Sequence, residues 1–263
     1  MSLPVQLTSL PGPFTDSRAA TVTAFGSDRA STTRQIGVVI PVHNEEDLLA
    51  ACLHSVAAAA AQVTVPVQIV VALDRCTDRS ADIVRASRTG ALLVESSTPG
   101  VGAARAAGNQ AILDRYGVDQ VWLAGTDADS TVSPDWLRRQ LRHAAAGADV
   151  VIGTIDVLDW ESHSMAVQSS HAFNYHRGNG HRHIHGANLA MTARAYLAAG
   201  GFDSLLVDED VELIAAMQAT GQRLVWAGDL PVATSARAQG RAIGGFADHL
   251  QQLGNRTAVL DAS

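Results

Sequence analysis

The sequence predicts an α/β fold in which helices cover both faces of a mostly parallel sheet. Three observations lead to this prediction. Apolar segments of strand length alternate with helical segments between residues 36 and 155, which is typical of βαβ units. Hydrophobic residues make up 47% of the 263-residue chain, enough for a large core. One apolar segment, 120–125, runs directly into Asp127 and Asp129, and open sheets bind ligands at the carboxyl ends of their strands.

The first expected βαβ unit begins with an apolar run at 36–41 that ends at Pro41. Asn44 is a good N-cap for the next helix, because acidic residues follow it and an apolar helical face begins at Leu48. Residues 67–73 form the second expected strand. These three elements predict a parallel pair of strands with a crossover helix.

The alternation continues to the Asp pair. A helix capped by Thr77 or Asp78 is expected next, and residues 91–95 form a short third strand. Residues 102–116 are expected to be helical, and 120–125 form the fourth strand.

The chain beyond the Asp pair is less regular. Ser133 as N-cap and Pro134 at the first helical position predict another helix, and residues 149–155 return as a strand. After residue 156 the alternation weakens, although Glu209 opens a further helix with an apolar face. We therefore expect the second half of the chain to contain fewer regular βαβ units and to carry residues that determine specificity.

The chain is expected to form a single domain over residues 35–263. Residues 1–34 contain prolines and polar residues without apolar periodicity, so we expect a flexible extension there.

The bulk composition excludes several classes of protein. The chain has 19 basic and 26 acidic residues, a net charge of −7, which argues against a nucleic-acid partner. Two cysteines are too few for a disulfide framework. No apolar run approaches the roughly 18 residues of a membrane span, so no integral membrane segment is expected, and the N-terminus lacks a signal-peptide pattern. A cytoplasmic protein is the simplest expectation.

The residues Asp127 and Asp129 form a candidate metal site. Carboxylates at i and i+2 of an extended strand end point to the same side. Such a pair suits a hard divalent cation, which can bind the phosphates of a nucleotide. A solvated turn is the alternative, but two carboxylates this close repel each other without a cation.

A glycine-rich segment, GVGAAR at 100–105, follows the third expected strand. It favours a helix start near a phosphate, with Gly102 allowing close approach and Arg105 available for pairing. A tight turn with a surface arginine is the alternative. Dinucleotide-binding and P-loop glycine motifs are absent from the sequence.

Five of the ten histidines lie between residues 171 and 185. His181, His183 and His185 alternate and would share one face of a strand. They could supply a metal ligand, line an acceptor pocket, or hold zinc, although a zinc site lacks the usual spacing. A polar lid hinged at Gly178 and Gly180 is a further alternative.

Five segments in order resemble a family 2 glycosyltransferase with the GT-A fold, over residues 36 to about 250. These segments are VVIPVHNEE at 38–46, LDRCTD at 73–78, TDADS at 126–130, GANLAM at 186–191, and GGFD with DED at 200–203 and 208–210. The resemblance implies a donor half at 35–130 and an acceptor half at 131–263.

The resemblance implies roles for the donor-side residues. The first segment, with Pro41, His43 and Glu45, would contact the nucleotide. Asp74 would accept from the nucleotide's base, although Leu73 replaces the family's first aspartate and Asp74 could instead cap a turn.

The resemblance also assigns the Asp pair. Asp127 would reach the ribose or the metal, and Asp129 would ligate Mn²⁺ or Mg²⁺. The segment with Arg237 and Arg241 resembles one that approaches the diphosphate, or else forms a surface patch.

The acceptor-side residues follow from the same resemblance. Asp210, in the pair Glu209-Asp210, would be the general base, with Asp208 as a competitor for this role. Alternatively, acids here only favour the helix dipole. Asn188 belongs to an acceptor-side segment.

The sequence therefore predicts a metal-dependent, inverting transferase. It would move a sugar from a UDP- or GDP-type donor to an unknown hydroxyl acceptor. Alternatives are a retaining enzyme of the same fold, a sugar-phosphate nucleotidyltransferase, and a non-catalytic nucleotide-sugar-binding protein.

Overall fold

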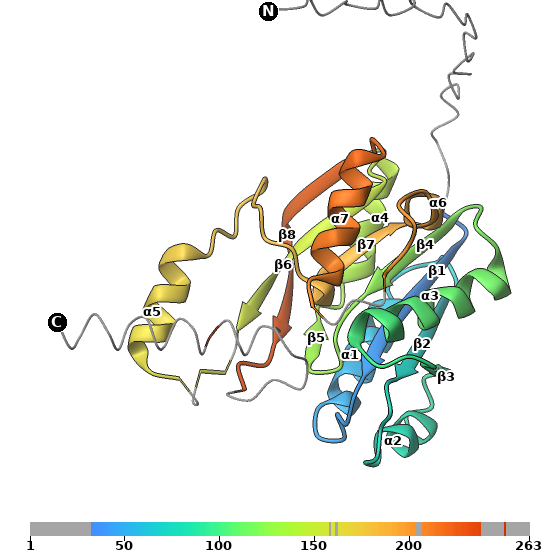
Figure 1. Cartoon of the computed structure of the whole chain (residues 1–263), viewed down its shortest axis with the longest axis horizontal. Coiled ribbons are helices and arrows are strands. Elements are labelled where there is room, and N and C mark those ends of the chain that lie inside the picture. Colours follow the sequence, from blue (N-terminus) through green and yellow to red (C-terminus); the bar gives the residue numbers. More distant parts are fainter. Residues whose placement is uncertain (1–32, 158, 161–162, 204–206, 238–249, 251–263) are drawn as a thin grey trace, which may run out of the picture.

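The computed structural model describes residues 33–157, 159–160, 163–203, 207–237 and 250 (Figure 1). The strands are β1 Gln35–Val42, β2 Val67–Leu73, β3 Leu92–Glu95, β4 Val121–Gly125, β5 Ser130–Val132, β6 Val150–Val157, β7 Leu189–Thr192 and β8 Leu224–Thr234. The helices are α1 Leu49–Ala60, α2 Ser80–Ala86, α3 Val101–Tyr116, α4 Trp136–Ala145, α5 Met165–Asn174, α6 Ala193–Ala198 and α7 Glu209–Ala219, with a 3₁₀ turn, η1, at Gly186–Asn188. Most of the expected N-terminal extension lies outside the described residues.

The described strands form one sheet in the order β3-β2-β1-β4-β7-β6-β8-β5. The pairs β1–β2, β1–β4, β2–β3 and β6–β8 are parallel. The pairs that involve β7 and β5 are antiparallel. The predicted fold class is confirmed, and each antiparallel pair among the described strands includes at least one strand that follows the Asp pair.

Helices cover both faces of the sheet, and each face has its own core (Figure 1). One core joins the sheet to α1, α2 and α4, and the other joins it to α3, α6 and α7. Trp122 and Trp136 are fully buried, and their indole N–H groups donate to the side chains of Gln140 and Asn188. Each tryptophan therefore adds apolar area without leaving a buried donor unpaired.

The first two crossover helices begin later than the sequence predicts. α1 begins at Leu49 and has no side-chain cap. Asn44 lies at φ 54°, and its side-chain oxygen accepts from the backbone N–H groups of Thr77 and Asp78. The prediction that Asn44 caps a helix is wrong because its side chain ties two loops together. In α2, which begins at Ser80, Asp78 accepts from the Ser80 N–H without occupying the N-cap position.

Two further expectations shift by a few residues. β1 continues through Pro41 to Val42. α4 begins at Trp136, so Ser133 and Pro134 precede the helix; the Ser133 hydroxyl instead donates to the carboxylate of Asp135, the N-cap residue. Helix starts depend on loop contacts that local propensity does not contain.

The topology brings the carboxyl ends of β1, β2 and β4 to one edge of the sheet. The loops after these strands carry His43, Asp74 and Asp127. β7 runs antiparallel to β4, so its start and the preceding turn η1 reach the same edge. In the described part of the chain, no helix has the length and apolar character needed to cross a membrane.

Candidate active site

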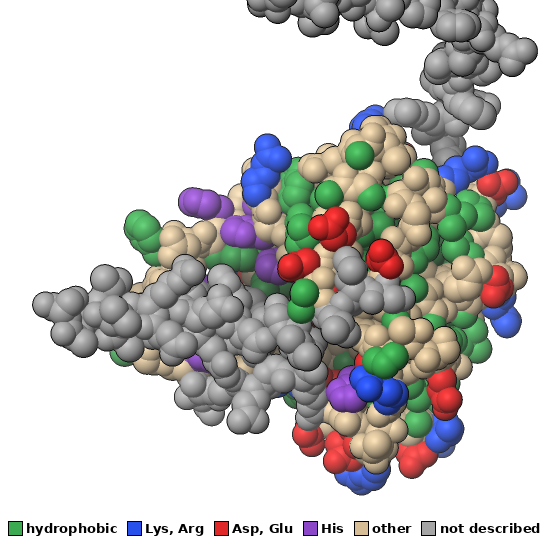
Figure 2. All heavy atoms as spheres, in the orientation of Figure 1, with side chains coloured by type: hydrophobic (Ala, Val, Ile, Leu, Met, Phe, Trp, Pro, Cys, Tyr) green, Lys and Arg blue, Asp and Glu red, His purple; other side chains and the backbone are tan. Residues whose placement is uncertain are grey.

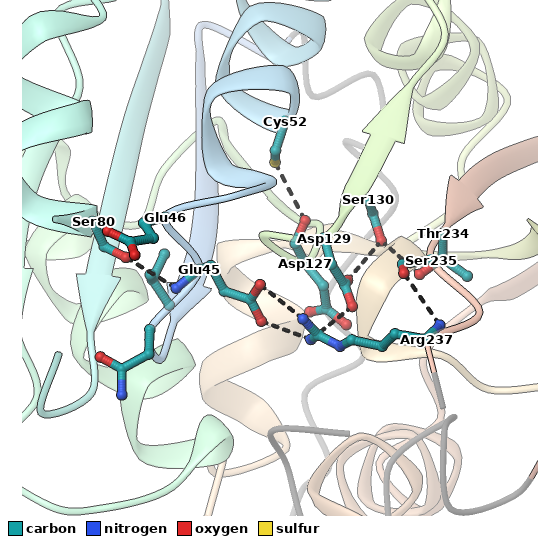
Figure 3. A network of polar contacts seen from close by, with 12 residues as sticks. Glu45, Glu46, Cys52, Ser80, Asp127, Asp129, Ser130, Thr234, Ser235 and Arg237 are labelled. Carbon is teal, nitrogen blue, oxygen red and sulfur yellow. Dashed lines mark hydrogen bonds and ion pairs between the residues drawn. The ribbon is translucent and has the colours of Figure 1, made fainter. Parts of the chain in front are cut away.

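Acidic side chains gather at this edge, between the β4–β5 loop and the start of α7. Asp127 and Asp129 follow β4, and the Cys52 thiol on α1 donates to the backbone oxygen of Asp127 at 3.3 Å (Figure 3). Glu209 and Asp210 open α7. Figure 2 shows acidic side chains near the centre of one face, with histidines to one side of them. The sheet thus collects carboxylates from segments about 80 residues apart in the chain.

Arg105 joins the two acidic segments. One guanidinium Nη bonds to Asp127 Oδ1 at 2.6 Å, and the other bonds to Glu209 Oε1. The Arg105 side chain is 5% exposed. Burial opposes its charge, but the carboxylates of Asp127 and Glu209 outweigh this and raise its pKa. Arg105 is therefore an internal ion-pair partner, and the prediction that it pairs with a phosphate is not supported.

Two glycines make the Arg105 contacts possible. A Cβ on Gly186 would lie 2.4 Å from the Arg105 guanidinium carbon. A Cβ on Gly102 would lie 2.6 Å from the backbone oxygen of Asp203 and 3.1 Å from the Glu209 side chain. Gly102 thus allows α3 to pack against the segment that leads into α7, which differs from the predicted approach to a phosphate.

A second arginine holds Asp129. Arg237 follows β8, and its two Nη atoms bond to both Glu45 oxygens at 2.9 and 2.6 Å (Figure 3). The second of these nitrogens also lies 2.9 Å from Asp129 Oδ2. Burial opposes the Arg237 charge, but its bonds to Glu45 raise its pKa overall. Arg241 lies outside the described residues.

The donor set of Asp127 and Asp129 fits a hard divalent cation. Burial, and then the neighbouring Asp127 carboxylate, raise the pKa of Asp129 to about 6. A nearby positive charge would relieve that repulsion, and carboxylate oxygens are the ligands that Mg²⁺ and Mn²⁺ prefer. Within the described residues, no group of three or more His, Cys, Asp or Glu side chains is arranged to hold a metal. A cation here would therefore need ligands from elsewhere, such as phosphate or water.

Replacing Asp129 by Asn is expected to stabilise the protein at pH 8 by up to about 3 kcal/mol. The raised pKa means that ionised Asp129 disfavours the folded state above about pH 6. The gain should shrink as pH falls from about 6 to about 4 and vanish below the ordinary Asp pKa of 3.8. Urea unfolding of both proteins at pH 8 and pH 4 checks this. Equal stability of the two at pH 8 would contradict it.

Asp74 and His43 organise the donor-side loops. The Asp74 carboxylate accepts from Gly100 N–H and Arg75 Nε, both at 2.9 Å. Burial acts in the opposite direction, but these bonds lower its pKa. His43 Nδ1 lies 2.6 Å from the Asp74 backbone oxygen. Asp74 thus holds the start of α3 in place, which is close to the alternative prediction that Asp74 caps a turn.

An open pocket of about 480 Å³ lies between the β1–α1 and β2–α2 loops. Its lining is polar, and three of its six residues are acidic: His43, Asn44, Glu46, Asp47, Thr77 and Asp78. Pro41 is buried within β1 and Glu45 is turned towards Arg237. Of the three predicted first-segment residues, His43 alone lines this pocket.

Asp210 lies half-buried at the start of α7. Its Oδ2 accepts from the backbone N–H of Gly186 at 2.6 Å, which fixes it against η1. Asp208 is exposed, lies at φ 60°, and makes no side-chain cap. Of the two candidate bases, Asp210 is the one held inside the acidic edge.

His171 lies in α5, whereas His181, His183 and His185 lie in an irregular loop and not on the strand that their alternation suggested. Tyr175 is its centre: the ring stacks on His183 with centroids 4.1 Å apart, and the hydroxyl lies 2.9 Å from His185 Nε2. The His171 ring also stacks on Tyr175, with the centroids 4.9 Å apart. His181 is buried with Nε2 3.2 Å from the Ile152 backbone oxygen, and burial lowers its pKa. His181 therefore belongs to the protein interior, and the prediction of a lid that carries all three alternating histidines is wrong for this residue.

Asn188 is also structural. It is fully buried, and its amide nitrogen donates to the backbone oxygens of Thr154 and Leu230 at 2.8 and 2.6 Å. Its oxygen accepts from Trp136. All these bonds lie within the protein, so the expectation that Asn188 faces an acceptor is wrong.

The sequence did not indicate which residues of this edge pair with one another, and Tyr175 was missed. The Arg105–Glu209 pair joins residues 104 positions apart, and Arg237–Glu45 joins residues 192 apart. No local pattern reports such contacts. Tyr175 could have been found, because it lies among the five clustered histidines.

Comparison with known proteins identifies related sequences. Residues 37–200 match the family model described as "Glycosyl transferase family 2". The "Succinoglycan biosynthesis protein ExoO" of Rhizobium meliloti (strain 1021) is 33% identical over 134 residues, covering 50% of this chain and 36% of that protein. This chain thus spans little more than a third of the length of that curated relative.

Solved structures share the fold at low sequence identity. TarS 1-349 of S. aureus in complex with UDP-GlcNAc is 15% identical, with a TM-score of 0.57 over 86% of this chain and 66% of that one. The mannosyltransferase PcManGT of Pyrobaculum calidifontis, in complex with GDP-Man and Mn²⁺, is 19% identical, with a TM-score of 0.58 over 78% and 58%. These neighbours are GT-A glycosyltransferases, so the predicted fold is confirmed.

Proposed function

We propose, from the premise that this chain belongs to glycosyl transferase family 2, that it moves a sugar from a nucleoside-diphosphate donor to an acceptor hydroxyl with inversion. One observation carries the proposal. Arg105 binds Asp127 on the donor side and Glu209 beside Asp210 on the acceptor side. A cation-binding pair and a candidate base therefore belong to one charge-linked unit.

The donor side is proposed to bind the nucleotide along the loops after β1, β2 and β4. The pocket beside His43 offers acceptors for base N–H or ribose hydroxyl groups. Mn²⁺ or Mg²⁺ held by Asp127 and Asp129 would neutralise charge on the diphosphate leaving group. Two structural neighbours were solved with UDP-GlcNAc and GDP-Man, which supports a UDP- or GDP-type donor. The cytoplasmic location expected from the sequence stays a prediction.

Asp210 is proposed as the general base. Its Oδ1 would take the proton from the acceptor hydroxyl while that oxygen attacks the anomeric carbon. The bond from the anomeric carbon to the phosphate oxygen breaks, and the diphosphate leaves with the electron pair. The Gly186 N–H on Oδ2 orients the carboxylate. A positioned base of this kind contributes about 10²- to 10⁴-fold to the rate.

The acceptor is proposed to approach past His183 and His185. His185 directly precedes Gly186, which contacts Asp210. The rings of His183 and His185 are half-buried and stack with their centroids 6.2 Å apart. His181 and Asn188 stay outside this proposal, because both are buried in the protein.

Thermal-shift titration tests the donor proposal. Sugar conjugates of UDP, GDP, ADP, CDP and TDP are added with and without Mn²⁺, because a ligand of the folded state raises Tm by mass action. We expect a metal-dependent shift for a UDP or GDP sugar that Asp129→Ala loses. The control Asp119→Asn, at an exposed ion pair before β4, should keep it. No shift with any donor would contradict the proposal.

A further inference from the structure

Arg237 holds a position between two carboxylates of the acidic edge. It lies three residues beyond β8. Nη1 bonds to one Glu45 oxygen at 2.9 Å, while Nη2 bonds to the other at 2.6 Å and to Asp129 Oδ2 at 2.9 Å (Figure 3). Only Nη2 is shared, so Arg237 can lose Asp129 and keep a bond to Glu45.

The ion pairs of this edge leave a charge deficit. Two guanidiniums, Arg105 and Arg237, bond to the four carboxylates of Asp127, Glu209, Glu45 and Asp129. Among these six described side chains, four negative charges therefore meet two positive charges. The Glu45 and Asp129 side chains are only 6% and 17% exposed, and several carboxylates gathered in a buried site repel one another. A single divalent cation would balance the set.

We propose that Arg237 is a tethered counter-charge that competes with the donor-site cation for Oδ2 of Asp129, with Glu45 as its anchor. The inference rests on the proposed function, because it takes Asp127 and Asp129 as the cation ligands. Arg237 is a positioning residue in this account. It neutralises Asp129 before loading, and Glu45 keeps the guanidinium beside the site after Asp129 changes partner.

Competition lowers the apparent affinity for the cation. If Arg237 is away from Asp129 in about one molecule in ten, the apparent Kd is about tenfold weaker than the intrinsic value. Removing the guanidinium should recover that factor.

Calorimetric titration of the full chain with Mn²⁺ alone tests the proposal. Arg237→Gln is expected to bind Mn²⁺ about tenfold more tightly than the wild type. Arg237→Lys keeps the charge but cannot span two carboxylates, so it should also bind more tightly, by a smaller factor. Arg194→Gln is the matched control. It removes a positive charge from the exposed ion pair between Arg194 and Asp119. Asp119 precedes β4 and so lies at the opposite end of that strand from Asp127. This variant should leave the affinity for Mn²⁺ unchanged.

Other outcomes would overturn the proposal. Equal or weaker Mn²⁺ binding by Arg237→Gln would mean that Arg237 does not compete. Tighter binding by Arg237→Gln with no change in Arg237→Lys would mean that the effect comes from net charge alone and not from competition for Asp129. Mn²⁺ binding by none of the proteins would also refute it, while a nucleotide-sugar shift in Tm without metal would leave donor binding intact. Circular dichroism confirms that each variant is folded.

Discussion

Replacing Asp210 by Asn is expected to lower the rate of sugar transfer by about 10²- to 10⁴-fold, with donor binding unchanged. The Asn amide oxygen can still accept from the Gly186 N–H, which contacts Asp210 Oδ2 at 2.6 Å. The amide has no basic oxygen to take the acceptor proton. The loss should therefore appear in kcat and not in the Tm shift caused by the donor.

Asp208→Asn is the matched control for this prediction. Asp208 is exposed at φ 60°, a conformation that Asn tolerates well, so this variant should fold and keep its rate. Nucleoside diphosphate release under saturating donor measures both variants. A full rate in Asp210→Asn with a lost rate in Asp208→Asn would transfer the base role to Asp208.

Replacing Arg105 by Met is expected to lower the free energy of unfolding by about 3–5 kcal/mol, because it removes the partner of buried carboxylates. Glu209 is 7% exposed and loses its guanidinium partner, as does Asp127. Met fills similar volume, so the loss reports charge more than packing. Urea unfolding at pH 7 measures the difference.

Two variants isolate the cause of this loss. Arg115→Met lies on the same helix at an exposed position and should change stability by less than about 0.5 kcal/mol. Adding Glu209→Gln to Arg105→Met should recover part of the stability, since it removes one of the unpaired charges. An Arg105→Met protein as stable as the wild type would show that the ion pairs of Arg105 contribute little to the free energy of unfolding.

The fold could be predicted from the sequence because each strand of the first half is an apolar run between turn residues. The antiparallel strand β7 and the pairing of β6 with β8 could not, because they depend on contacts across the sheet. The bulge between Gly153 and Thr154 is an example. A Cβ on Gly153 would lie 2.2 Å from the Asn188 amide nitrogen, a contact that no local window contains.

The candidate site was predicted in part. Asp127 and Asp129 lie at the acidic edge because they directly follow β4, but they belong to the loop between β4 and β5 and not to the extended strand end that their i, i+2 spacing suggested. The partners of Arg105 and Asn188 could not be predicted, because they come from distant segments. The alternation of the histidines suggested a strand. The structure has a loop there, which contains glycines and in which the Tyr175 ring stacks on His183.

Proton NMR of the first sugar product distinguishes inversion from retention at the anomeric carbon. The enzyme is incubated with the α-linked nucleotide sugar that shifts its Tm, and with an acceptor alcohol or water as the attacking group. A single displacement with Asp210 as base predicts a β-configured product, formed before any mutarotation. An α-configured first product would contradict inversion and the role given to Asp210.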